Sequence, residues 1–308
     1  MGRYLLRRLL QLIPVFIGTT FFIYVLVWKV PGDPFAGKCG ERRCPDAYIQ
    51  FMTEKYKLNE SVFVQYGNYM KHLLQGDFGE TYGGQSINAI IANAYPNTIK
   101  LALVALAIEA LIGLTAGVLS GLRRNGFLDN LVLVSTLFML ALPVFVTAYL
   151  LQYLFALKLG IVRATVSSEV NFSELIVPGF VLGSASMAYI ARLARTSIAE
   201  NRRADYVRTA IAKGLPMRRV VGVHLMRNSM IPVLTFLGTD LGALMGGAII
   251  TEGMFNINGI GRQVFRAILT KESATVVSIV VLLVVVYLLM NLIVDLLYAA
   301  LDPRIRYE

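Results

Sequence analysis

Three acidic residues, Glu109, Asp240 and Asp295, stand inside long apolar stretches of this 308-residue chain. An ionisable group within a membrane-spanning helix costs about 3 kcal/mol or more, which makes each acid a candidate functional group. Glu109 and Asp240 lie near the middle of their stretches, and they could pair internally, line a wet pathway or relay protons. Asp295 lies nearer one end, where a role at the membrane interface or in helix pairing fits equally well.

The two cysteines, Cys39 and Cys44, flank the sequence Gly-Glu-Arg-Arg. On an oxidising face of a membrane they would form a disulfide. Because the loop that it closes is so short, its restriction of the unfolded chain would stabilise the fold by only about 2 kcal/mol. Free thiols are the alternative, whereas a single pair of cysteines falls short of the four ligands of a structural zinc site. We expect the disulfide and no metal site.

Motifs of catalysis are absent from the sequence. It has no G-x-x-x-x-G-K-[ST] phosphate loop, no nucleophile elbow and no H-E-x-x-H zinc motif. We therefore expect no enzymatic activity and no cofactor bound by this chain. If the protein takes part in active transport, the energy has to come from another subunit.

The composition is typical of a polytopic membrane protein. Apolar residues make up 56% of the chain and charged residues 16%, whereas about a quarter of a soluble domain is charged. A helix needs about 20 apolar residues to cross a bilayer, and lipid favours helices because their backbone groups pair internally. The sequence predicts one all-α domain over residues 1–308 with six transmembrane helices, near residues 9–30, 98–122, 131–157, 175–191, 230–250 and 274–301.

The basic residues follow the positive-inside rule if both termini are cytoplasmic. The segments then predicted to be cytoplasmic hold 16 of the 29 Lys and Arg residues and five of the 19 acids. A nucleic-acid-binding protein would instead need one contiguous basic face. This topology leaves a long extracytoplasmic loop, 31–96, with one or two short helices in its middle. It also leaves a cytoplasmic loop, 192–228, with two short helices separated at Gly214-Leu215-Pro216.

Glycines at four-residue spacing mark helix faces where a neighbouring helix can approach closely. Ordinary packing within the bundle is one explanation, and a place beside a translocation path is another. We expect the fifth span to line such a path near Asp240, which points away from the glycine row of that span. The rows are Gly113, Gly117 and Gly121 in the second span, Gly179 and Gly183 in the fourth, and Gly238, Gly242 and Gly246 in the fifth.

The segment from Ala204 to Leu215 resembles the cytoplasmic coupling loop, or EAA loop, of permease subunits of binding-protein-dependent ABC importers. It is most similar to the peptide and nickel subgroup, whose loop reads D-Y-[IV]-R-T-A-R-A-K-G-L. Two positions depart from the subgroup's patterns: Ile211 replaces the second loop arginine, and Ile257-Asn258 replaces W-P. The resemblance covers essentially the whole chain, with further matches at 5–9, 30–34, 76–79, 224–228, 252–255, 259–262 and 302–306.

The resemblance implies a type I (MetI-like) ABC importer permease of the bacterial inner or plasma membrane that transports dipeptides or oligopeptides. It implies four kinds of partner: a second homologous permease subunit, two ABC ATPase subunits that use ATP and Mg, an extracytoplasmic solute-binding protein and the lipid bilayer. The path would run near Glu109 and Asp240. The contact with the ATPases would fall on Asp205, Tyr206, Arg208, Thr209, Ala210, Lys213, Gly214 and Leu215.

Other cargoes and one other mechanism compete with this interpretation. Nickel, glutathione and haem are alternative substrates within the same family, because the binding protein does much of the selecting. A secondary transporter driven by protons through Glu109 or Asp240 is the alternative from a different class. It would transport its substrate in vesicles that have a proton gradient and no ATP.

Overall fold

Long apolar helices dominate the computed structural model, which describes residues 2–29 and 44–301. Four of them are long and apolar enough to cross a membrane unaided. They are α1 (Gly2–Trp28), α4 (Ile87–Leu122), α7 (Ile176–Asn201) and α14 (Ser273–Leu301). They match the predicted first, second, fourth and sixth spans, but α4 begins eleven residues before the predicted Thr98 and α7 continues ten residues beyond Ala191.

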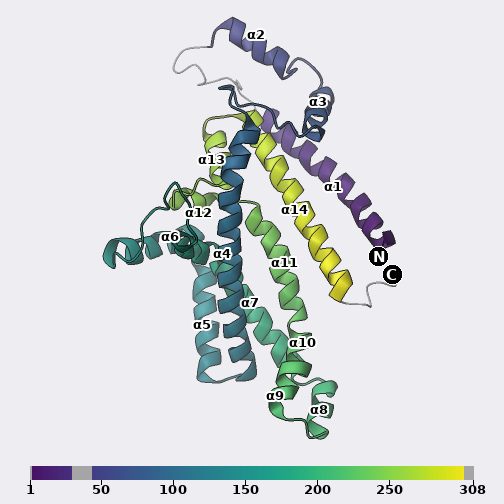
Figure 1. Cartoon of the computed structure of the whole chain (residues 1–308), viewed down its shortest axis with the longest axis vertical. Helices are drawn as coiled ribbons and strands as arrows, with labels where there is room; N and C mark the ends of the chain where they lie inside the picture. The colour runs from purple at the N-terminus through teal and green to yellow at the C-terminus, as the bar shows by residue number, and fades with distance from the viewer. Residues whose placement is uncertain (1, 30–43, 302–308) are drawn as a thin grey trace.

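The predicted third span, 131–157, is not one straight helix. It is divided into α5 (Phe127–Ala141) and α6 (Val144–Leu151), and α6 continues as one π-helical stretch to Lys158. The two halves meet at an angle of 105°. Pro143 explains the bend, because proline has no amide hydrogen and disfavours helical backbone in the preceding residue. In Figure 1, α6 extends sideways from the bundle.

The predicted fifth span, 230–250, also differs from the prediction. The helix α11 (Ile231–Met245) stops at Gly246, and the chain turns at Gly247, whose φ is +89°. Two short helices, α12 (Ile249–Met254) and α13 (Ile260–Leu269), follow. At its other end, α11 bends by 46° from the helical segment Met217–Ser229. If each bent pair counts as one span, the described residues contain six spans.

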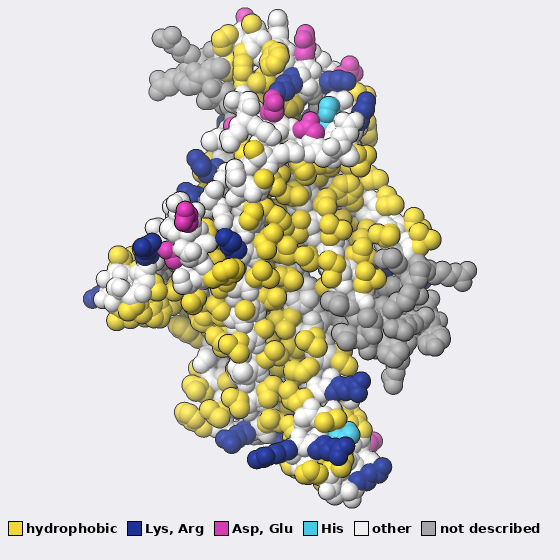
Figure 2. Space-filling view, viewed as in Figure 1, with side chains coloured by type: hydrophobic (Ala, Val, Ile, Leu, Met, Phe, Trp, Pro, Cys, Tyr) yellow, Lys and Arg dark blue, Asp and Glu magenta, His cyan; other side chains and the backbone are white. Residues whose placement is uncertain are grey.

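The two polar loops lie at opposite ends of this bundle (Figure 1). One end carries α2 (Asp46–Lys55) and α3 (Val62–Leu74), which confirms short helices in the first loop. The other end carries α8 (Asp205–Ala212), α9 (Met217–Arg219) and α10 (Met226–Ser229). Figure 2 shows hydrophobic side chains over much of the middle of the molecule, as a membrane protein requires, and charged side chains at both ends and on the lateral projection that carries α6.

Some predicted features fall outside the described residues. These are Cys39, residues 30–34 and residues 302–306 of the family resemblance. Cys44 itself is buried in a small cluster with Met52 and Tyr82. The disulfide between Cys39 and Cys44 therefore stays a prediction.

Candidate functional site

The loop of residues 205–229 forms a compact unit with a small hydrophobic core of its own. Val207 and Ala210 lie three residues apart on one face of α8 and are 2% and 5% exposed. They pack with Ile198 of α7 and with Val220 and Leu225 from the second half of the loop. The loop is therefore attached firmly to the end of α7.

A left-handed turn closes α8. Gly214 has a φ of +72°, and its amide donates to the carbonyl of Ile211. Glycine adopts this conformation without the steric cost that other residues pay. Pro216 then precedes α9, so the break predicted at Gly214-Leu215-Pro216 is confirmed.

The outward face of the loop combines charged and apolar side chains. The side chains of Asp205 and Arg208 are 98% and 71% exposed and lie 3.8 Å apart. Thr209, Lys213 and Gly214 are also exposed, whereas Leu215 is half-buried. The hydroxyl of Tyr206 donates to Asn201 Oδ1 at 2.6 Å, which holds the tyrosine against the end of α7.

Two features of this face were not predicted. Ala210 was expected to offer an apolar contact to a partner, but it lies in the loop's own core. The exposed aliphatic residues of the loop are instead Ile211, Met217 and Val223, at 49%, 60% and 53%. The helical period alone does not show this, because Ile211 lies four residues after Val207 and would share its face. Contacts with Val220 and Leu225 from the second half of the loop decide which side chains are buried.

A buried ion pair anchors the same end of the bundle. Asp129, at the start of α5, is fully buried and accepts hydrogen bonds from both Nε and Nη2 of Arg195 on α7. The hydroxyl of Ser120 on α4 also donates to Asp129. Three helices therefore meet at one carboxylate beside the loop.

The two mid-membrane acids lie together. Asp240 of α11 is close enough to Glu109 of α4 for their carboxyls to interact electrostatically. Glu109 is fully buried, and its two carboxyl oxygens and Oδ2 of Asp240 make no hydrogen bond within the described part of the chain. Internal pairing was one of the alternatives left open for these two acids, and their equal depth in antiparallel spans is the sequence signal that favours it.

The glycine rows lie at helix contacts. A Cβ atom at Gly117 would be 2.6 Å from the carbonyl oxygen of Ala191, so only glycine allows α4 to lie this close to α7. Gly113 and Gly121 face α7 in the same way, and Gly179 and Gly183 of α7 face α4. Gly238 and Gly242 of α11 pack against α14, whereas Gly246 forms the end of α11.

A buried carboxylate organises the segment between α11 and α14. Glu252 is fully buried and accepts hydrogen bonds from the Thr98 hydroxyl and the Arg262 amide, both at 2.8 Å. The Thr98 hydroxyl accepts in turn from the amide of Ile260 at 2.8 Å. Burial raises the pKa of Glu252, while these hydrogen bonds oppose that rise. Glu252 thus joins α12 and α13 to α4.

Metal ligands do not gather in this structure. Within residues 2–29 and 44–301, no group of three or more His, Cys, Asp and Glu side chains could hold a metal ion. His72 lies 3.6 Å from Asp77, and Asp295 lies 3.3 Å from Arg8 of α1. The interactions around Asp295 therefore join α1 to α14.

Known proteins match this chain from end to end. It is 37% identical to the dipeptide transport system permease protein of Alkalihalophilus pseudofirmus, over 99% of each chain. It is 35% identical to the oligopeptide transport system permease protein of Haemophilus influenzae, over the full length of both. It is 33% identical to the di/tripeptide transport system permease protein of Pseudomonas aeruginosa, over 99% of each.

Two family models divide the chain between them. The N-terminal model for membrane components of binding-protein-dependent transport systems matches residues 1–102. The model described as the inner membrane component of such systems matches residues 113–307, which include the loop, the glycine rows and Glu252. This chain is a member of the family of inner membrane components of binding-protein-dependent transport systems.

Proposed function

We propose that this chain is a membrane-spanning subunit of an ATP-driven importer of dipeptides or oligopeptides. The names of the relatives, all peptide permeases, support the substrate class. The observation that carries the proposal is the loop of residues 205–229, which has its own core and an exposed face at one end of the bundle. Such a face fits a contact with a separate ATPase, and this chain has no phosphate-binding loop.

The loop is built to transmit force to the spans. Its core includes Ile198 of α7, and its second half leads through α10 into α11. A push on a rigid unit moves the helices attached to it, whereas a flexible loop would absorb the motion. Nucleotide-driven closure of two ATPases would therefore tilt α7 and α11. The spans would then alternate between two states that nucleotide and substrate bias.

The proposal includes a topology and a set of partners. The end with α8 lies in the cytoplasm together with both termini, because that end carries the arginine-rich loop. The partners are a second homologous permease subunit, two ABC ATPases that use ATP and Mg, and a solute-binding protein on the side of α2 and α3. The path runs between this chain and the second permease subunit, near Glu109 and Asp240.

Uptake by the reconstituted importer tests this proposal. Proteoliposomes that contain both permease subunits and the ATPases, supplied with binding protein, should accumulate labelled dialanine when ATP is provided. They should not do so with a proton gradient alone. Uptake driven only by the gradient would favour proton coupling through Glu109 and Asp240. Uptake of nickel, glutathione or haem in place of dialanine would keep the mechanism and replace the substrate.

The exposed apolar residues of the loop test the contact with the ATPases. Ile211→Glu and Met217→Glu should leave the thermal stability of the permease unchanged, because both side chains are exposed. Each should reduce copurification of the ATPases and uptake severalfold. Leu74→Glu is the matched control for copurification of the ATPases, since Leu74 is 82% exposed at the end of α3, on the opposite end of the molecule. If all three variants behave alike, the 205–229 loop is not the contact.

A further inference from the structure

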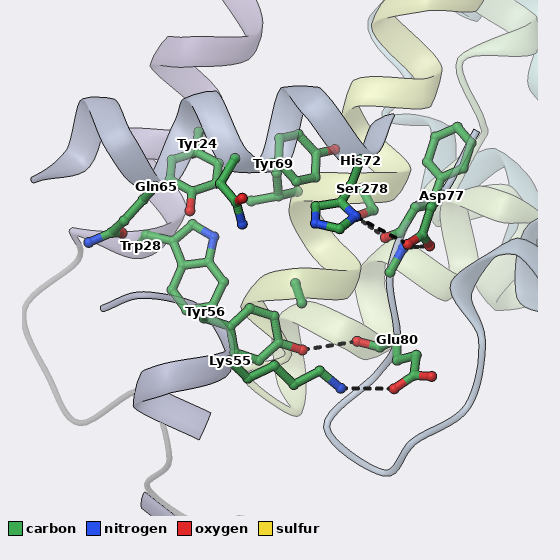
Figure 3. A pocket seen from close by; sticks show the side chains of 15 residues that line it. Tyr24, Trp28, Lys55, Tyr56, Gln65, Tyr69, His72, Asp77, Glu80 and Ser278 are labelled. Atoms are coloured by element: carbon green, nitrogen blue, oxygen red, sulfur yellow. Dashed lines mark hydrogen bonds and ion pairs between the residues drawn. The ribbon is translucent and has the colours of Figure 1, made fainter. Parts of the chain in front are cut away.

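A cavity of about 250 Å³ lies at the end of the molecule that carries α2 and α3. Side chains from α1, α2, α3 and α14 line it together with the turn Asp77–Glu80 (Figure 3). It is distant from the 205–229 loop, which lies at the other end of the bundle. It is also separate from the glycine-lined contact of α4 with α7.

One wall of the cavity is aromatic. Four rings follow one another along it in the order Tyr56, Trp28, Tyr24 and Tyr69, with centroids 5.3, 6.1 and 5.6 Å apart. Burial raises the pKa of Tyr56 and of Tyr69, so both hydroxyls are neutral. The faces of neutral tyrosine and tryptophan rings attract cations, and several such rings around one space form an ammonium site.

The opposite wall carries an excess of negative charge. Two carboxylates, those of Asp77 and Glu80, and one ammonium group, that of Lys55, line this part of the cavity. The Lys55 ammonium group lies 2.8 Å from the Glu80 carboxylate. Among the described residues that line the cavity, the two carboxylates outnumber the one ammonium group, and His72 lies 3.6 Å from Asp77. Figure 3 shows Asp77 on the far side of the cavity from Tyr24 and Trp28, and Glu80 beside Tyr56, whose hydroxyl donates to the Glu80 carbonyl at 3.2 Å.

The turn that carries these acids is held in place. Asp77 Oδ1 accepts from the amide of Gly79 at 2.8 Å, and the Ser278 hydroxyl of α14 donates to the carbonyl of Phe78 at 2.7 Å. Asn88 of α4 accepts from the Phe78 amide and donates to the Gly76 carbonyl. The acidic wall is therefore preorganised, which lowers the cost of binding a ligand.

A buried donor also borders the cavity. The hydroxyl of Tyr69 makes no hydrogen bond within the part of the chain that the structure describes. Ser278 is close to it, but its hydroxyl donates to the carbonyl of Phe78 and makes no hydrogen bond with Tyr69. A buried polar group without a partner costs free energy, so this hydroxyl favours a ligand that brings an oxygen acceptor.

We propose that this cavity binds a primary ammonium group that has an oxygen acceptor a few bonds away. The ammonium would lie between the aromatic wall and the carboxylates, and the oxygen would accept from Tyr69. Two sources carry this chemistry: the amino terminus of a free peptide and the phosphoethanolamine headgroup of a lipid. The site is new to this chain, and it does not depend on the proposed transport activity.

The only tryptophan of the chain, Trp28, gives a direct readout. The full-length chain is placed in nanodiscs of phosphatidylglycerol, and its tryptophan emission is followed during titration with glycylglycine and with phosphoethanolamine. Both should change the emission saturably, whereas N-acetylglycylglycine, which lacks the ammonium group, should not. An equal response to the acetylated compound, or no saturable response up to millimolar concentrations, would overturn the proposal.

Nanodiscs that contain phosphatidylethanolamine separate the two sources. If the lipid headgroup occupies the cavity, the emission is already shifted in these discs and the soluble probes no longer titrate. If a peptide amine is the natural ligand, glycylglycine titrates as it does in phosphatidylglycerol. Either result supports the ammonium site and identifies its source.

Substitutions of the charged wall should act in opposite directions. Glu80→Gln and Asp77→Asn remove negative charge and should weaken glycylglycine binding by about two- to fivefold. Lys55→Met removes the competing cation and should strengthen binding by a similar factor. Glu54→Gln is the control, because Glu54 is exposed on α2 and does not line the cavity. A purely structural effect would weaken binding in all three cavity variants, and that pattern would refute the site.

Discussion

Arg195 of α7 and Asp129 of α5 form a two-pronged ion pair, with Nη2 of the arginine 2.8 Å from Oδ2 of the aspartate. The side chain of Asp129 is 1% exposed and that of Arg195 is 17% exposed. Asp129 also accepts from the backbone amide of Asn125 at 2.8 Å, so it fixes the turn between α4 and α5. A charge this deep is tolerated because its hydrogen-bonding capacity is filled.

We predict that Asp129→Asn destabilises the protein by about 3 kcal/mol, because it leaves the guanidinium of Arg195 without its counter-charge. Thermal unfolding of the purified chain in detergent measures the loss. Asp205→Asn is the matched control: it also removes a carboxylate partner of an arginine, but at an exposed site where ion pairs contribute little. Equal melting temperatures for the two variants would show that the Asp129 pair is not structural.

The close packing of Gly259 against Glu252 leads to a second prediction. A methyl group added at Gly259 would overlap the Glu252 carboxylate, which cannot move without losing its bonds to Thr98 and Arg262. Gly259→Ala should therefore destabilise the protein by about 1–3 kcal/mol. Gly253→Ala, in α12 where a Cβ atom meets open space, should be neutral or stabilise the helix by up to about 1 kcal/mol. Denaturant unfolding compares the pair, and a harmless Gly259→Ala would contradict the proposed packing.

How far the sequence predicts this structure depends on the distance over which each signal acts. The Gly214-Leu215-Pro216 break is a local signal, and the loop has the two helical parts that were predicted on either side of it. Pro143 was an equally local signal that the apolar run obscured, so the third span was predicted straight. By contrast, Thr98 and Glu252 are 154 residues apart, and nothing in either neighbourhood indicates that they meet.

The same difference between local signals and long-range contacts applies to the candidate site. Coupling residues were proposed from a family resemblance, which indicates a segment but not which side chains face outward. Burial of Ala210 and exposure of Ile211 and Met217 follow from contacts with Val220 and Leu225 across the break. The proximity of Glu109 and Asp240 likewise depends on how α4 and α11 pack. Tertiary packing decides both, and a periodic pattern in one helix does not encode it.

The third prediction separates the loop's fold from its contact surface by two adjacent substitutions. Ala210→Glu places a charge in the loop's core and should unfold α8 locally, because burying an unpaired charge is costly. Thr209→Glu places the same charge on the exposed face and should leave α8 folded while ATPase copurification falls. Hydrogen exchange of the α8 amides in the full chain measures the local unfolding. Faster exchange in both variants, or in neither, would mean that the two positions are not distinguished by burial.

The fourth prediction concerns the path near Asp240. Its Oδ2 atom is buried beside Glu109, while Gly238 and Gly242 of the same helix pack against α14. If α11 lines the route, this face has to open to water during transport. The carboxyl groups of Asp240 and Glu109 are buried side by side, and each needs water around it once the two separate. In a Cys39→Ser/Cys44→Ser background, Asp240→Cys should resist a membrane-impermeant thiol reagent at rest and react during ATP turnover.

Val294→Cys is the control for that experiment, because Val294 lies against Gly238 and should stay unreactive in both states. The assay requires that the Asp240→Cys importer still takes up labelled dialanine, so that labelling is read from a working cycle. Reaction only during turnover would support a place for α11 beside the path, with the opening tied to nucleotide. An Asp240→Cys importer that transports normally and never reacts would place this face permanently in the packed bundle, and the path would then have to run along other helices.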